Sequence, residues 1–308
     1  MLKRKIIGAV LVLALLLSFA GLTTQAATRV DTGLRGSLTL TYGYDGQMFD
    51  GLNIRIYRVA EISEFADFAL TGAFAALPIS LENIKTQEEW REIASTASAY
   101  VVSEEIPADN EIPTGEDGTV TFTDLSLGLY LVYMVRVEQE DGYCHFDSFM
   151  ISVPTLDEED NWVYDVVARP KSFHKVIVPK QISYTVNKLW RDEGHEHLRP
   201  QTISIEVYRD GEFVETVVLS AENNWTYTWT TTDDGAIWQA VETDVPDGYS
   251  VTLEQDGNYF FVTNSYDDPP PPPDTGDIGR PYLYLILMVA AGLGLIVLGI
   301  TGKRGKKA

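Results

Sequence analysis

The sequence predicts a mainly β chain, with two tandem β-sandwiches, one helix inserted in the first, a signal peptide and one C-terminal transmembrane helix. Short runs rich in β-branched and aromatic residues recur along the chain, separated by Gly, Asp and Pro. Both ends carry a long apolar run beside basic residues. About 250 residues lie between these ends, which is enough for two domains.

The N-terminal end has the features of a secretory signal peptide. Lys3, Arg4 and Lys5 precede an apolar run from Ile6 to Ala20, and small residues follow it up to Ala27. We therefore expect residues 1–27 to be removed and the mature chain to leave the cytoplasm.

The C-terminal end predicts a single membrane span. Tyr282 to Ile300 are 19 uncharged, mostly apolar residues, and as a helix they would reach roughly 28 Å, about one hydrocarbon core. Lys303, Arg304 and two further lysines follow the span. By the positive-inside rule this basic tail stays in the cytoplasm and everything before the span faces outward.

The charge of the exposed part excludes one class of partner. Without the three basic residues at the start, the five from Arg280 onward and Asp277, residues 28–276 hold 15 Lys and Arg against 44 Asp and Glu, a net charge of −29. Such a surface repels phosphate backbones and anionic lipid, so nucleic acid is not expected as a partner. The charge fits a solvated protein of the cell surface.

Cysteine and histidine usage predicts neither a disulfide nor a metal site. Cys144 is the single cysteine of the sequence, so no intrachain disulfide can form. His195 and His197 lie in a Gly-containing loop without a third ligand at a clear spacing. We expect no metal and no cofactor.

The first sandwich is predicted from five strand runs and one helix. Thr86 and Glu89 form a capping box, and Trp90, Ile93 and later apolar residues follow at helical spacing, so we expect a helix packed on a sheet edge or face. The strand runs are Gly36–Gly46, Leu52–Ile62, Gly118–Leu125, Gly128–Val137 and Ser148–Pro154.

A second series of strands begins after a short linker. Its runs start at Ser183, Thr202, Phe213, Asn224, Ala236, Tyr249 and Asn258, with turn signals at the spacing of a small antiparallel sandwich. Five prolines follow, and they predict a stiff spacer. The predicted parts are the signal peptide 1–27, first sandwich 28–172, linker 173–180, second sandwich 181–266, spacer and sorting motif 267–276, and anchor with tail 277–308.

Three strands of the second sandwich each place one polar residue on an otherwise apolar face. By alternation, Lys188 shares a face with apolar residues of its strand, as do Glu242 and Asn264 in theirs. Burial would lower the pKa of Lys188 and raise that of Glu242. A neutral amine is a nucleophile, and a protonated carboxyl can polarise the Asn264 carboxamide and shuttle protons.

The product would be a Lys188–Asn264 isopeptide bond, formed as ammonia leaves. It would close a loop of 76 residue steps and, by the relation used for disulfides, stabilise the fold by roughly 4 to 5 kcal/mol. Alternation alone also fits the alternative in which Lys188 extends into solvent and Asn264 ends a strand.

The second sandwich resembles a Cna-B-type, prealbumin-like domain of Gram-positive surface proteins. The resemblance covers Gln181 to Tyr266. It rests on Lys188-x-Trp190, Arg199-Pro200, Asn224-Trp225, Glu242 with Pro246-x-Gly248-Tyr249, and Thr263-Asn264. It implies an Ig-like or prealbumin-like sandwich in which Lys188, Glu242 and Asn264 form a spontaneous isopeptide bond, with Glu242 as its catalyst.

The first sandwich is similar to the N-terminal domain of sortase-assembled pilins. "NWVYDVVARPK" fits the pilin motif at Trp162, Val166, Pro170 and Lys171 and departs from it at Ala168-Arg169. The resemblance implies that Lys171 is the polymerising lysine, with Lys175 and Lys180 as open alternatives. No lysine occurs between Lys5 and Lys85, so we expect no isopeptide bond of this type there.

Pro273, Asp274, Thr275 and Gly276 resemble a cell-wall sorting signal of the LPxTG kind, with Pro272 in the usual Leu position. The resemblance implies that a membrane sortase attacks the Thr275 carbonyl and passes the acyl group to an amine of another pilin subunit or of a peptidoglycan cross-bridge.

We therefore expect a structural protein rather than an enzyme, namely a sortase-processed, wall-anchored pilin subunit. A monomeric wall-anchored adhesin, or an adhesin stalk that binds host or neighbour-cell ligands, is the alternative.

Overall fold

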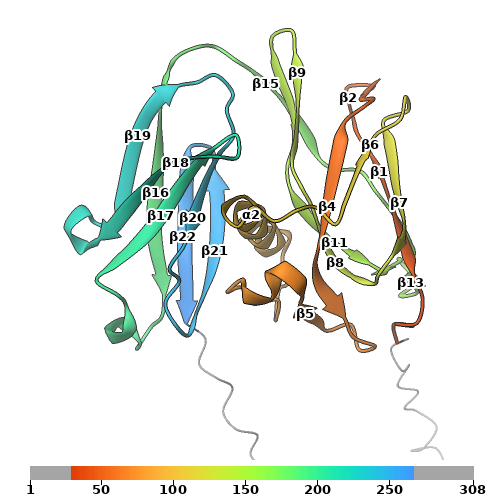
Figure 1. Ribbon diagram of the computed structural model, residues 1–308, viewed down its shortest axis with the longest axis horizontal. Helices are drawn as coiled ribbons and strands as arrows, with labels where there is room; N and C mark the ends of the chain where they lie inside the picture. Colours follow the sequence, from red (N-terminus) through yellow and green to blue (C-terminus); the bar gives the residue numbers. More distant parts are fainter. Residues whose placement is uncertain (1–28, 267–308) are drawn as a thin grey trace, which may run out of the picture. The chain divides into compact units, whose positions relative to one another are not determined.

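The computed structural model describes residues 29–266, and the prediction of a mainly β chain is confirmed there (Figure 1). No helix among these residues is long and apolar enough to cross a membrane. The predicted signal peptide, proline spacer, sorting motif and membrane span lie outside the described residues.

The first sandwich packs two sheets around one apolar core. In the first sheet β1 pairs in parallel with β14 and antiparallel with β7. In the second, the order is β11-β8-β4-β5, and β6 pairs with β4. Leu38 of β1, Phe122 of β7 and Ile54 of β4 are buried in the core between them. The strands are β1 (Gly36–Thr41), β4 (Asn53–Ile62), β5 (Phe68–Leu70), β6 (Asn110–Pro113), β7 (Thr119–Leu125), β8 (Gly128–Val132), β11 (Phe149–Val153) and β14 (Asp165–Ala168).

A third sheet differs from the sequence prediction. The run expected as one strand, Gly128–Val137, divides into β8 and β9 (Val135–Gln139), because β9 pairs with β10 (Gly142–Phe146) instead of continuing in the sheet of β8. β10 also pairs with β15 (Ser172–Val176), which lies where the sequence suggested a linker. The local sequence could not show this pairing because its two strands are about 30 residues apart.

Helix α2 (Gln87–Ser103) confirms the predicted insertion and its capping box. Glu89 N donates to Thr86 Oγ1 over 3.1 Å, and Thr86 N donates to Glu89 Oε2 over 2.8 Å. One side of α2 packs through Ile93 and Ala97 on the outer face of the sheet that contains β4 and β8. For this reason β8 is buried at every position, with the sandwich core on one face and α2 on the other.

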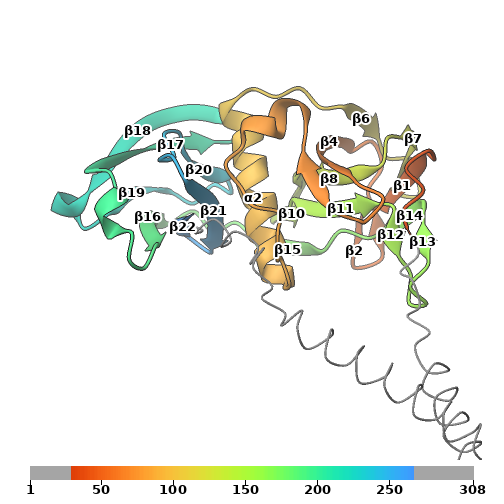
Figure 2. The same ribbon diagram turned by 90° about the horizontal axis from the view of Figure 1, so that it is seen from below.

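The second sandwich contains all seven predicted strands, in two sheets (Figure 2). Their orders are β19-β16-β22-β21 and β18-β17-β20. Its first and last strands, β16 and β22, lie side by side in parallel, as β1 and β14 do in the first sandwich. The strands are β16 (Gln181–Arg191), β17 (Thr202–Arg209), β18 (Glu212–Ser220), β19 (Thr226–Thr232), β20 (Trp238–Glu242), β21 (Tyr249–Asp256) and β22 (Tyr259–Tyr266).

The remaining elements are short. They are β2 (Gly43–Tyr44), β3 (Gln47–Met48), β12 (Thr155–Leu156), β13 (Trp162–Val163), and the 3-10 turns η1 (Gly72–Ala76), η2 (Glu196–Leu198) and η3 (Ala221–Asn223).

Candidate functional site

The structure brings Lys188, Glu242 and Asn264 together inside the second sandwich. Lys188 follows the predicted alternation of β16, whereas Glu242 lies in β20, which is buried at every position, and Asn264 lies in a buried run of β22. All three side chains point into the sandwich. The parallel register sets Lys188 opposite Val262 and Trp190 opposite Asn264. Lys188 and Asn264 are therefore two positions apart on neighbouring strands, and Glu242 approaches them from the facing sheet.

The contacts among the three groups are direct. Lys188 Nζ lies 3.5 Å from Glu242 Oε2, and neither side chain has any exposed surface. Asn264 Nδ2 donates to Glu242 Oε1 over 2.8 Å. Lys188 Nζ also donates to the carbonyl oxygens of Leu189 and Val262. The carboxyl of Glu242 thus bridges the amine and the carboxamide.

Burial shifts the pKa values of the amine and of the carboxyl toward their neutral forms. Desolvation lowers the pKa of Lys188 from 10.5 to about 8, although the nearby Glu242 acts in the opposite direction. Desolvation likewise raises the pKa of Glu242 against the attraction of Lys188. Two neutral partners are what aminolysis of an amide requires, because a protonated amine has no lone pair.

Two oxygen atoms of the site have unused hydrogen-bonding capacity. Within the described chain, Glu242 Oε2 and Asn264 Oδ1 are buried and make no hydrogen bond. A half-turn of the carboxamide would exchange Nδ2 and Oδ1 and let Oδ1 accept a hydrogen bond from a protonated Glu242. That hydrogen bond would polarise the carbon that the amine has to attack.

A group of aromatic and charged side chains surrounds the Lys188 amine near the C-terminal end of β16. Lys188 Nζ lies 4.2 Å from the ring centre of Trp190, whose ring packs edge-on against Trp225 and Tyr249. The Tyr249 hydroxyl donates over 2.9 Å to Asp192. Arg199 forms a two-pronged ion pair with the same carboxylate, with distances of 2.5 and 2.7 Å.

Sequence reasoning missed Asp192 in this group. It is the acidic partner that joins Arg199 to Tyr249, and the Arg199 hydrogen bonds hold its pKa below the usual range. The signal for it was present, because Asp192 follows β16 two positions after Trp190 and seven before an arginine.

The first sandwich lacks the corresponding chemistry. Its parallel first and last strands pair Leu38 with Val166 and Leu40 with Ala168, so apolar residues occupy the inward positions. Among the described residues that are buried, Lys188 is the single lysine.

The candidate polymerising lysines lie in and after the β14–β15 segment. Lys171 is exposed between β14 and β15, and Lys180 is exposed just before β16. Lys175 lies in β15, and its Nζ is 3.3 Å from the buried Asp233 carboxylate. Pro273, Asp274, Thr275 and Gly276 lie outside the described residues.

The other candidate residues are placed as follows. Cys144 is a free, fully buried thiol in the core of the first sandwich, and burial raises its pKa. His195 stacks on Tyr266, with ring centres 4.4 Å apart. No group of three or more metal-ligating side chains occurs within residues 29–266.

The segment that carries the Lys188 site matches a known domain family. Residues 184–265 match the family model of the Cna protein B-type domain. A collagen adhesin of Staphylococcus aureus is 36% identical over 146 residues, which cover 42% of this chain and 12% of that protein. The chain thus spans only a small part of the curated relative that it matches.

Among solved structures, the chain has matches of low identity to a surface-protein repeat and to a pilin. A single B repeat unit of the collagen-binding surface protein of S. aureus is 16% identical, covering 76% of this chain and 99% of that one, with a TM-score of 0.27. The full-length major pilin SpaD of Corynebacterium diphtheriae is 19% identical, covering 77% and 66%, with a TM-score of 0.29. These scores are too low to establish a shared fold for the whole chain.

Proposed function

We propose that this protein is a structural pilin subunit of a Gram-positive cell surface, stabilised by an isopeptide bond between Lys188 and Asn264. The observation that carries the proposal is the fully buried contact of Lys188 with Glu242, which in turn binds the Asn264 carboxamide. The match of this segment to the B-type domain family supports it.

The reaction follows from the positions of the three groups. A proton passes from the Lys188 ammonium to Glu242 Oε2, leaving both groups neutral. Glu242 then donates to Asn264 Oδ1, and Lys188 Nζ attacks Cγ. The Nζ–Cγ bond forms, Glu242 passes a proton to Nδ2 and takes one from Nζ, and the Cγ–Nδ2 bond breaks as ammonia leaves. The protein acts once, on itself, and needs no cofactor.

The intact mass of the folded ectodomain tests this chemistry. We expect a loss of one ammonia, which is absent in Glu242→Ala and in Lys188→Met. A wild-type protein of unreduced mass contradicts the isopeptide proposal, and a loss of two ammonia molecules contradicts the absence of such a bond in the first sandwich.

For assembly, we propose that a membrane sortase cleaves after Thr275 and joins its carbonyl to Lys171 of another subunit, with the last subunit passed to a peptidoglycan cross-bridge. The exposure of Lys171 between two strands supports this assignment, since a sortase must reach the amine. Wall extracts should contain SDS-resistant multimers that disappear with Lys171→Ala. Lys175→Ala and Lys180→Ala are matched controls that should leave them intact.

A second candidate is a monomeric wall-anchored adhesin or its stalk. The 36% identity to a segment of a collagen adhesin favours this candidate. A single SDS-resistant band in wall extracts, unaffected by Lys171→Ala but lost with Thr275→Ala, would support it over the pilin. Binding of the purified ectodomain to collagen and to other host matrices would test an adhesive role directly.

A further inference from the structure

The first sandwich covers the side of the second sandwich that is formed by β20 and β21. β20 and β21 are end strands of their two sheets, and α2 contacts both. Leu253 N donates to Thr96 Oγ1 and Val251 N donates to the Pro78 carbonyl, each over 2.7 Å. Two amides of the β21 edge therefore have their hydrogen-bond partners in the first sandwich, where an isolated edge would expose them.

The apolar core of the second sandwich continues into α2. Ala99 of the helix is 2% exposed and belongs to the same cluster of buried residues as Ala240 and Val262. Beside it, a pocket of about 340 Å³ that is partly open to solvent is lined by Ala99 and Tyr100 from α2 and by Glu242 from β20, whose side chain has no exposed surface. α2 therefore forms one wall of a pocket that Glu242 also lines.

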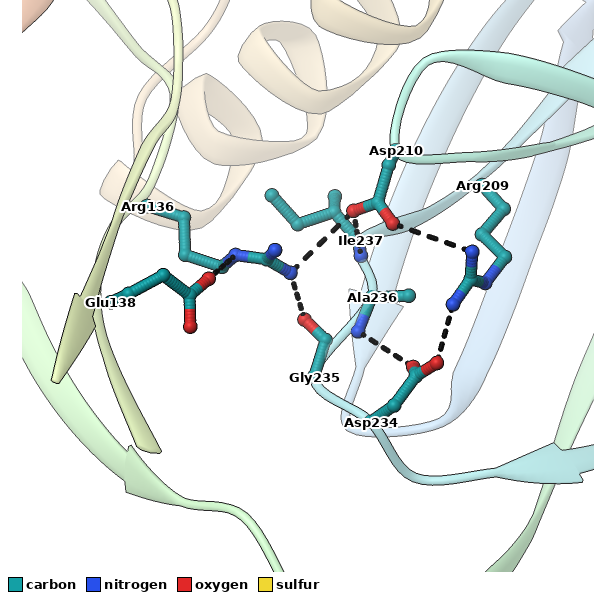
Figure 3. Close-up of polar contacts among 8 residues, drawn as sticks. All are labelled: Arg136, Glu138, Arg209, Asp210, Asp234, Gly235, Ala236 and Ile237. Carbon is teal, nitrogen blue, oxygen red and sulfur yellow. Dashed lines mark hydrogen bonds and ion pairs between the residues drawn. The ribbon is translucent and has the colours of Figure 1, made fainter. Parts of the chain in front are cut away.

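A polar network holds the two sandwiches together at another point (Figure 3). Arg136 of β9 donates to the Gly235 carbonyl, and its guanidinium lies 3.5 Å from Asp210 Oδ1. Asp210 in turn accepts from Ile237 N over 2.9 Å. The loops that lead into β18 and β20 are thereby fixed to the first sandwich.

From these contacts we infer that α2 is the wall that keeps water from the Glu242 side of the reaction site, so that the isopeptide bond forms efficiently only after the two sandwiches have docked. This inference rests on the proposed function. Without α2, this pocket would lose one of its walls, and water would reach the side of β20 that the helix now covers, next to the Glu242 carboxyl. A hydrated site favours the ammonium and carboxylate forms, which cannot react.

Two variants of the full chain would disturb docking of the sandwiches without replacing any of the three reacting residues. Ala99→Arg places a charge in the buried contact of α2, and Arg136→Glu sets two like charges together at Asp210. Among the described residues, the Lys188 and Asn264 side chains have Leu189, Val262 and Glu242 as hydrogen-bond or ion-pair partners, so neither substitution removes such a partner. Arg35→Glu is the matched control, because Arg35 pairs with Asp124 on an exposed part of the first sandwich.

Mass spectrometry of peptides, at timed intervals after synthesis, measures the cross-linked fraction. Amide hydrogen exchange at Val251 and Leu253 measures whether the two sandwiches are docked. At pH 7 a lysine of pKa 8 is neutral in about one molecule in ten, whereas at its ordinary pKa it is neutral in roughly one in 3,000. We therefore expect cross-linking to slow by at least about tenfold in both variants, with faster exchange at the two amides.

The control should match the wild type in both measurements. Faster exchange at Val251 and Leu253 with an unchanged rate of cross-linking would overturn the inference. A wild-type chain without any cross-link would instead refute the proposed function itself.

Discussion

Removing the proposed isopeptide bond while leaving the core filled should lower the melting temperature of the protein. Lys188→Met removes the nucleophile and keeps an unbranched apolar side chain in a site without solvent exposure. The proposed bond would close 76 residue steps, and the loop-entropy relation gives about 4.5 kcal/mol at 25 °C. For both sandwiches unfolding as one unit, residues 29–266, that corresponds to a fall in Tm of roughly 9–18 °C.

The assay is differential scanning calorimetry of wild type and Lys188→Met, with the bond content of each sample measured by mass. Glu242→Gln is the informative companion, because it also blocks the reaction but leaves the Lys188 amine buried without a carboxylate. We expect it to melt below Lys188→Met, since an unpaired buried charge is destabilising. If Lys188→Met melts within about 3 °C of a fully cross-linked wild type, the structural role assigned to the bond is wrong.

Three further predictions concern groups with a defined environment. In the uncross-linked Asn264→Ala variant, the pKa of Lys188 in the folded state lies below the unfolded value of 10.5, so the unfolded chain binds more protons than the folded chain above pH 8. The free energy of unfolding should therefore rise by roughly 1 to 2 kcal/mol between pH 8 and pH 9.5. Urea titrations should show this rise in Asn264→Ala and should not show it in the double variant Lys188→Met/Asn264→Ala. Thr86→Ala removes the N-cap of α2 and should destabilise the fold by about 1 kcal/mol, measured by the same titration. Cys144 is fully buried, so a thiol reagent should label it only at the rate of unfolding, and rapid labelling of the native protein would show an accessible thiol.

The strand pattern explains why the reactive residues were predictable. β16 alternates so regularly that an inward Lys188 follows from Tyr184 and Val186 on the same face, and both are buried as expected. The same rule places Asn264 inward from β22. Alternation says nothing, however, about which faces meet, so the resemblance to a known domain type was needed to group the three residues.

The packing of α2 on β20 and β21 of the second sandwich could not be predicted, for a different reason. Thr96 and Ala99 are small residues on a helix whose other side already packs on the first sandwich. Helical spacing identifies a face but not its neighbour, and the hydrogen bond from Leu253 to Thr96 joins residues 157 positions apart. β20 likewise has five buried residues instead of an alternating pattern, and nothing local in its sequence gives the reason.

The parallel contact between β16 and β22 determines which part of an assembled fibre would feel tension. With subunits joined through Lys171 and Thr275, a pull would run along the backbone from Lys171 to Lys188, cross the isopeptide bond, and leave through Asn264. Residues 189–263 would form a bypassed loop that experiences no stretching. Most of the first sandwich lies before Lys171 in the chain, but β15 follows Lys171 and pairs with β10, so the β10–β15 ladder would carry part of the load before it reached Lys188.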